Sequence, residues 1–306
     1  MNALWIPLAL TAGVLQSFRN GFARSLSGAI SPALNSWSRF AFNLPFSILL
    51  VSALFALNGF PSTSPRYYLL CLATGVTQLL GNVCLIAAFR HTNFAQAIAL
   101  HKLEIVFTAL IGAFVFSEFP TAVGWTGILV CAAGVILIQL ARVSTDLDGA
   151  KGALHVDIGS VLAVLAGLFL VLASFSLKEA NSVLVELNPR VGAGRFEVAA
   201  HTLFNVTWME VVMLTGWLCW RLPGELARVR LHWRRMLLIG LTGFLGSLGW
   251  FWAYSLTLVA YVKALGQIEA IAAVLFSLFI WKEREVLKQL PGMALIVLGI
   301  MLVLLG

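Results

Sequence analysis

The sequence predicts an all-α integral membrane protein with ten transmembrane helices, arranged as two inverted repeats of five helices each. The first observation behind this prediction is composition, because 60% of the 306 residues are hydrophobic, only 11% are charged and the mean hydropathy is +0.94. A typical soluble domain has about 25% charged residues. The second is a series of apolar segments of about 20 residues, the length at which a helix crosses a bilayer. The third is an internal repeat.

The repeat relates two apolar segments that each carry a glutamate near the middle. Residues 95–118 (AQAIALHKLEIVFTALIGAFVFSE) align without a gap on residues 260–283 (AYVKALGQIEAIAAVLFSLFIWKE) after a shift of 165 positions, which brings Glu104 onto Glu269. Self-similarity at a fixed separation indicates a repeated structural unit. The same shift pairs Ala95 with Ala260, Gly81 with Gly246, Glu118 with Glu283, Gly127 with Gly292, and Gly134 with Gly299.

The order of elements follows from the apolar segments and the polar stretches between them. The first repeat is expected at residues 1–140, a polar linker (ARVSTDLDGAKGALHVD) at 141–157 and the second repeat at 158–306. A second long loop outside the bilayer is expected at 178–197, where Asn-Pro and Gly-Ala-Gly are turn signals. The ten spans are expected near residues 4–23, 34–57, 67–89, 94–116, 121–140, 157–177, 198–220, 236–256, 258–280 and 289–305.

An odd number of spans in each repeat means that the second repeat enters the membrane in the opposite orientation to the first. Inverted repeats are common in secondary transporters, whose substrate site lies near the bilayer midplane between the repeats. Most Lys and Arg residues are expected on the face reached after the first span. Cytoplasmic loops carry the excess of Lys and Arg, so this distribution favours both termini on the outside.

Several other classes of protein are disfavoured. The formal net charge of +7 comes from basic residues at helix ends and in short loops, which membrane topology explains better than nucleic-acid binding. The four cysteines lie in apolar segments without a CxxC pair, so they indicate neither a disulfide framework nor a metal site. P-loop, HExxH, GxSxG and GxGxxG signatures are missing. We therefore expect no enzyme, no cofactor and no metal.

Charged residues in the middle of spans are the strongest functional signal. A charged side chain at the bilayer centre costs about 2.5–3.5 kcal/mol on insertion scales, so such residues face a cavity or one another. One interpretation is a polar site whose carboxylates bind a proton or a cationic group. The other is a set of structural ion pairs that lock the fourth span to the ninth. The residues concerned are Lys102, Glu104, Lys263 and Glu269.

Helical spacing suggests how these side chains are grouped. Residues three or four apart share a face of a helix, as do His101 with Glu104 and Lys263 with Gln267. Lys102 and Glu104, two apart, are expected to point to nearly opposite sides. One cross-pairing places Lys102 or Lys263 near the glutamate of the other repeat and leaves the second carboxylate free to bind a proton. His101 alone is equally compatible with a packing and hydrogen-bonding role.

Aromatic and amide side chains form a second group of candidates. Trp250, Tyr254 and Tyr261 could line a cavity for a flat or cationic substrate through stacking or cation–π contacts. The alternative is an interfacial aromatic belt. Further polar candidates, equally compatible with hydrogen bonds between helices, are Asn82, Gln78, Asn43, Asn205, Trp208 and Glu210.

The ends of the fourth and ninth spans carry a family resemblance. The segments FVFSEFPTAVGWTGILVCAAGVILI (114–138) and LFIWKEREVLKQLPGMALIVLGIMLVL (278–304) each show an apolar span, a glutamate at its exit and a final span containing glycines. With the doubled five-span unit, they resemble the EamA-like ten-span branch of the drug/metabolite transporter superfamily. This resemblance implies a secondary carrier with spans 1–4 and 6–9 around a central cavity, and spans 5 and 10 at the periphery.

The expected function is export of a small polar or zwitterionic metabolite, such as an amino acid, by alternating access at a midplane cavity between the repeats. Lysines and glutamates in mid-span favour a charged or zwitterionic substrate over an apolar drug. Coupling to protons through Glu104 and Glu269 is one possibility. The alternatives are an exchanger of anionic metabolites of the nucleotide-sugar or sugar-phosphate type, and a membrane scaffold that transports nothing. The expected partners are the substrate and the lipid bilayer, in a bacterial inner membrane, with a monomer as one possible state.

Overall fold

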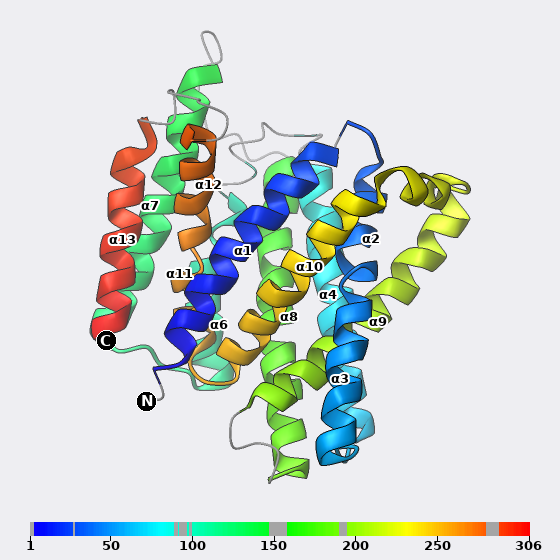
Figure 1. The fold of residues 1–306 in the computed structure, drawn as a ribbon. Coiled ribbons are helices and arrows are strands. Elements are labelled where there is room, and N and C mark those ends of the chain that lie inside the picture. Colours follow the sequence, from blue (N-terminus) through cyan, green and yellow to red (C-terminus); the bar gives the residue numbers. More distant parts are fainter. Residues whose placement is uncertain are drawn as a thin grey trace. The chain divides into compact units, whose positions relative to one another are not determined.

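A computed structural model describes most of the chain, and every regular element in the described residues is a helix (Figure 1). The predicted all-α membrane fold is therefore confirmed. Five of its helical segments are long and apolar enough to span a bilayer, at 32–58, 65–88, 158–187, 196–221 and 225–254. The described residues are 3–26, 28–88, 91, 97, 100–146, 158–189, 195–279 and 288–306.

The helices follow the predicted spans in order along the chain. Several spans are built from two pieces, such as α2 and α3, which meet at Phe42 and Asn43, just before Pro45. The bounds are α1 (Trp5–Leu26), α2 (Pro32–Ala41), α3 (Leu44–Asn58), α4 (Pro65–Ala88), α6 (Glu104–Phe116), α7 (Ala122–Asp146), α8 (Ile158–Leu187), α9 (Phe196–Arg221), η2 (Glu225–Arg228), α10 (Val229–Tyr254), α11 (Val259–Leu265), α12 (Ile268–Phe279) and α13 (Leu290–Leu305).

Two predicted loops are shorter than the sequence suggests. Residues 178–187 continue α8 as helix, because their polar side chains find partners: Asn181 donates to the Phe251 carbonyl at 3.0 Å, and Glu179 pairs with Arg66 at 2.6 Å. Residues 141–146 of the predicted linker belong to α7, while 147–157 lie outside the described residues. Glu283 and Ala95 of the repeat alignment also lie outside them.

The chain divides into two compact units, each built from both sequence halves. Unit 1 contains Met1–Val76 and Ser176–Leu256, and unit 2 contains Thr77–Phe175 and Thr257–Gly306. The domains predicted at 1–140 and 158–306 follow the sequence repeat, whereas each compact unit combines residues from both repeats. They stay a prediction.

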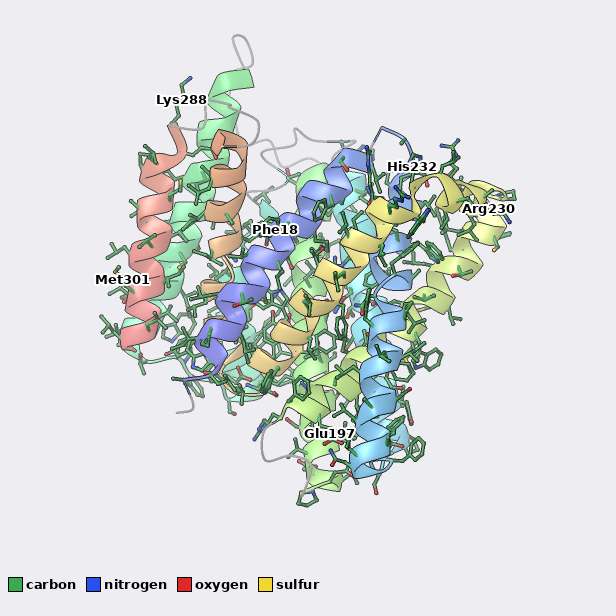
Figure 2. The ribbon with its side chains drawn as sticks, viewed as in Figure 1. Phe18, Glu197, Arg230, His232, Lys288 and Met301 are labelled. Carbon is green, nitrogen blue, oxygen red and sulfur yellow. The ribbon has the colours of Figure 1, made fainter. Side chains whose placement is uncertain are left out.

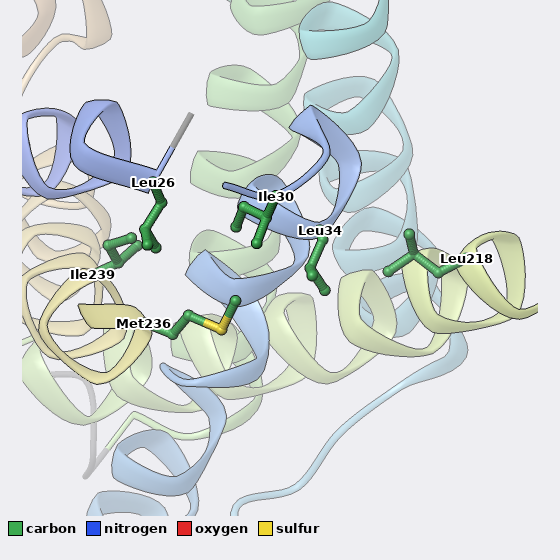
Figure 3. Close-up of a cluster of buried hydrophobic side chains, with 6 residues drawn as sticks. All are labelled: Leu26, Ile30, Leu34, Leu218, Met236 and Ile239. Atoms are coloured by element: carbon green, nitrogen blue, oxygen red, sulfur yellow. The ribbon is translucent and has the colours of Figure 1, made fainter. Parts of the chain in front are cut away.

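In unit 1, α1 lies along α10 and a cluster of apolar side chains fills the space at one end of this pair (Figures 1 and 3). Glycine lets the two helices approach, because a Cβ at Gly249 would lie only 3.1 Å from the Ala12 Cβ and 3.2 Å from the Leu8 carbonyl oxygen. The cluster comes from α1, the segment after it, α2, α9 and α10, and comprises Leu26, Ile30, Leu34, Leu218, Met236 and Ile239.

In unit 2, α7 and α13 run side by side (Figure 1) and meet at four glycines. A Cβ at Gly127 would lie 2.8 Å from the Gly299 carbonyl oxygen, and one at Gly134 would lie 2.7 Å from that of Gly292. The 165-position shift maps Gly127 onto Gly292 and Gly134 onto Gly299, so it exchanges one contact for the other. Such reciprocity is what two inverted copies of one helix produce, and small residues at such crossings let the backbones touch.

Candidate functional site

The fourth and ninth spans are both interrupted next to their charged residues. The sequence predicts continuous helices with the glutamates in mid-helix, and this prediction is wrong in detail. In the fourth span the backbone turns at Lys102 and Leu103, and in the ninth at Gly266 and Gln267. At both turns the hydrogen bonds close over three residues instead of four, as in Ile105 N–H to the Lys102 carbonyl at 3.3 Å.

The interruptions place each charge at a helix end of complementary polarity. Glu104 is the first residue of α6, Glu269 lies in the first turn of α12, and Lys263 lies in the last turn of α11. Helix N-termini carry partial positive charge and C-termini partial negative charge, so each position stabilises the charge it carries. The tight turns thus offset part of the cost of these charges within the membrane.

Glu104 and Lys263 form a buried ion pair in unit 2. The Lys263 ammonium donates to Glu104 Oε2 at 3.2 Å, and the two side chains are 8% and 10% exposed. It also donates to the Leu170 carbonyl of α8 at 3.5 Å. The pair joins residues of the two repeats, and it is one of the cross-pairings that the sequence leaves open. Each charge depends on the other, because removing either partner would leave the remaining charge buried and unpaired.

Three further sequence candidates, His101, Lys102 and Glu269, lie around this pair. His101 is 7% exposed and interacts electrostatically with Glu104, Lys102, Lys263 and Glu269. Its Nδ1 is buried and has no hydrogen-bond partner among the described residues. The charged side chains of both repeats therefore act on one another within unit 2.

Gln267 contacts the backbone of Lys263 and not its side chain, although the two residues were expected to share one face of a continuous helix. Its side-chain amide donates to the Lys263 carbonyl at 3.0 Å, so it satisfies the backbone where α11 ends instead of contacting the ammonium group. Helix C-termini leave carbonyl groups without intrahelical partners, and this amide supplies one.

A glycine of α8 permits the close packing behind the pair. A Cβ at Gly167 would lie 2.9 Å from the His101 carbonyl oxygen and 3.4 Å from the Glu104 Cβ. Sequence reasoning did not find Gly167 or the Leu170 carbonyl, since their roles depend on which helix lies behind α6. The sequence shows only that Gly167 and Leu170, three residues apart, lie on one face of the same helix.

Tyr261 is a packing residue of α11 rather than part of an open aromatic surface. It is 3% exposed, and its hydroxyl accepts the Thr121 N–H at 3.1 Å. The Glu118 carboxylate accepts the Val259 N–H at 2.9 Å, so the loop between α6 and α7 holds the beginning of α11 at two points. Glu118 therefore has a local role in placing the helix that carries Lys263.

The remaining candidates are distributed between the units. Trp250 and Tyr254 belong to unit 1, where their rings stack with centroids 6.0 Å apart and the Trp250 indole donates to Gln16 at 3.2 Å. Gln78 and Asn82 belong to the unit 2 part of α4 and are half-buried. Neither amide is hydrogen-bonded to Glu104 or Lys263.

The cluster in unit 2 offers matched charges in a small space. A carboxylate beside an ammonium can exchange its internal partner for the amine and acid of a zwitterion, so that both charges stay paired throughout. Charge-assisted hydrogen bonds of this kind are stronger than neutral ones. The arrangement suits reversible binding of a small charged molecule.

Comparisons with known proteins agree with the fold. Residues 3–140 match the EamA-like transporter family. A solved structure titled "Crystal structure of protein" shares 16% sequence identity, with 99% of this chain and 96% of that chain covered and a TM-score of 0.70, which shows the fold alone. No curated protein matches the chain. The first 140 residues are thus similar to the EamA-like transporter family, and the all-helical fold with helices of membrane-spanning length agrees with that similarity.

Proposed function

We propose that this protein is a secondary carrier that exports a small zwitterionic or otherwise polar metabolite, such as an amino acid. The observation that carries the proposal is the buried ion pair between Lys263 and Glu104, at interruptions of equivalent spans. Interrupted membrane helices near the midplane form the substrate and ion sites of many secondary transporters.

In the proposed binding step the substrate replaces the internal ion pair. Its ammonium group pairs with Glu104 and its carboxylate pairs with Lys263, while Lys102, His101 and Glu269 balance the charge. An unpaired charge in this environment is strongly unfavourable, so molecules that satisfy both partners together are favoured over simple amines or simple acids.

The interrupted helices also support alternating access. Residues at helix ends absorb changes in backbone angle more easily than residues in a continuous helix. The turns at 102–103 and 266–267 are therefore the proposed hinges, and substrate binding at the charged pair biases their position. We also propose that the protein lies in the cytoplasmic membrane of a bacterium with both termini outside the cell. This orientation rests on the distribution of Lys and Arg between the two faces.

Exchange of anionic metabolites is a second candidate, and one observation favours it. Three groups able to carry positive charge, Lys263, His101 and Lys102, interact electrostatically with Glu104. If the lysines bind a phosphate or sugar phosphate directly, Glu104 serves only to balance charge in the empty carrier.

The test is a thermal-shift screen of the purified protein against amino acids, amines, nucleobases, nucleotide sugars and sugar phosphates. A ligand that binds the folded state raises its apparent stability by mass action. We expect a zwitterion to stabilise the wild type, and this stabilisation to be lost in Glu104→Gln and in Lys263→Met. The matched control is Glu179→Gln, which alters a partly exposed carboxylate of unit 1.

Transport of the stabilising compound is then measured in proteoliposomes with the same variants. Stabilisation by phosphorylated compounds that survives Glu104→Gln but not Lys263→Met would replace the zwitterion proposal with the exchanger. If no compound binds, and the double variant Glu104→Gln/Lys263→Met is much less stable than the wild type, the ion pair is structural and the scaffold interpretation holds.

A further inference from the structure

Buried polar atoms without partners gather on one helix of unit 1. Among the described residues, five buried side-chain nitrogen or oxygen atoms have no hydrogen-bond partner, and three of them are on α9. Such atoms are rare in folded proteins, because removing a polar atom from water without giving it a hydrogen bond is unfavourable. The five are His101 Nδ1, Asn181 Oδ1, Glu197 Oε1, His201 Nε2 and Glu210 Oε1.

The two groups near the beginning of α9 have each other. Glu197 Oε1 lies 3.7 Å from His201 Nε2, one helical turn away, and its other carboxylate oxygen accepts from Asn58 at 3.0 Å. Figure 2 shows Glu197 near one end of unit 1, close to where α3 ends. A small side-chain adjustment or a water molecule satisfies this pair.

Glu210 has no comparable neighbour. It lies near the middle of α9, is 1% exposed, and makes no ion pair or hydrogen bond at Oε1 within the described part of the chain. Gly75 of α4 packs against it, since a Cβ there would lie 3.2 Å from the Glu210 Cγ. In this respect Glu210 is the opposite of Glu104, whose negative charge has the Lys263 ammonium beside it.

The charged and titratable groups around Glu210 do not change this picture. Arg39 of α2 acts on it electrostatically but donates no hydrogen bond to Oε1. On α4, Cys71 and Tyr67 lie one and two turns before Gly75, and α3 has no titratable residue. Arg39 is the charged group whose electrostatic effect on Glu210 is resolved. Other titratable side chains lie on η2 and the first turns of α10, and Figure 2 shows two of them, Arg230 and His232, at the end of unit 1 away from Glu197. The full set is Glu225, Arg228, Arg230, His232, Arg234 and Arg235.

We propose that Glu210 is a proton-binding site of the carrier, separate from the charged pair of unit 2. A buried carboxylate with one oxygen that has no hydrogen-bond partner, as Glu210 has at Oε1, is stabilised by taking up a proton, which removes the charge, whereas Glu104 has the Lys263 ammonium beside it. Binding and release of this proton during the transport cycle, with Arg39 as the group that favours the ionised form, would couple substrate movement to a proton gradient. This coupling role rests on the proposed carrier function.

The experiment is infrared difference spectroscopy of the full-length protein in lipid, recorded as a function of pH without substrate. A protonated carboxylic acid has a carbonyl stretch that ionisation removes and that shifts in D2O. We expect such a band in the wild type, its loss in Glu210→Gln, its retention in Glu104→Gln and Glu179→Gln, and its disappearance as pH rises. Glu210→Asp, which keeps an acid, serves if Glu210→Gln does not fold, and should give a displaced band.

Other outcomes overturn the inference. A band lost in Glu104→Gln but retained in Glu210→Gln assigns the proton to unit 2. Absence of any protonated band means that Glu210 is ionised, and a band that no pH removes means a permanently neutral packing residue. Because the spectra need no substrate, failure to find a transported compound leaves the proton site standing. Conversely, substrate transport that is unaffected by a pH gradient removes the coupling role alone.

Discussion

The ammonium of Lys263 lies 3.2 Å from Oε2 of Glu104, and the two residues come from spans that the 165-position shift makes equivalent. Each interrupted span thus contributes one charge to a single pair, instead of each span satisfying its own charges. Both side chains are almost fully buried, so the pair is sensitive to loss of either member.

The first prediction concerns the stability of this pair. Glu104→Gln or Lys263→Met alone should lower the free energy of unfolding by about 3–5 kcal/mol, because each leaves a buried charge without its partner. The double variant should recover most of this loss. Denaturant titration of the purified protein measures all four states of the cycle. Additive losses in the double variant would mean that the two side chains do not interact in the folded protein.

The second prediction concerns the glycine contacts between α7 and α13. Gly134→Ala should destabilise the protein by about 1–3 kcal/mol, because the new methyl group would lie 2.7 Å from the Gly292 carbonyl oxygen and force the helices apart. Gly216→Ala is the matched control, since nothing lies within 4 Å of a Cβ at that exposed position of α9. There the gain in helix propensity should stabilise by about 0.5–1 kcal/mol. Melting temperatures of the two variants should therefore shift in opposite directions.

The third prediction concerns the attachment of α11 to the loop before α7. Tyr261→Phe removes the hydroxyl that accepts the Thr121 N–H and should cost about 0.5–1.5 kcal/mol, the net value of one hydrogen bond. Tyr68→Phe, at a residue of α4 that is 41% exposed, should have little effect. Hydrogen exchange at residue 121 should accelerate in the first variant only. Unchanged exchange there would show that this hydrogen bond does not hold the loop.

The fourth prediction is of a small effect. Arg66 and Glu179 form a 2.6 Å ion pair in unit 1, but their side chains are 66% and 38% exposed. Solvent screens such pairs, so Arg66→Ala should change stability by about 0.2–1 kcal/mol at most. Raising the salt concentration should remove even this difference from the thermal unfolding curves. A loss as large as that at Lys263 would mean that the pair is far less hydrated than its exposure indicates.

Prediction from sequence succeeded best where the signal was carried by many residues. Apolar segments of spanning length gave the helical membrane fold, because a backbone in lipid must satisfy its own hydrogen bonds. It was less successful where single polar residues decided an element. The loop expected at 178–197, on its Asn-Pro and Gly-Ala-Gly turn signals, included Asn181 and Glu179, yet both lie in α8, where Phe251 and Arg66 supply partners that only the folded chain brings near.

For the candidate site, the sequence by itself determined which residues are exceptional, because a charge in an apolar span is costly wherever its neighbours lie. It therefore singled out Glu104 and Lys263. The tertiary structure alone decided that these two form the pair, that Gly167 backs it, and that Trp250 and Tyr254 lie in the other unit. These relationships depend on the turns that interrupt the spans and on the packing between helices, and neither leaves a regular period in the sequence.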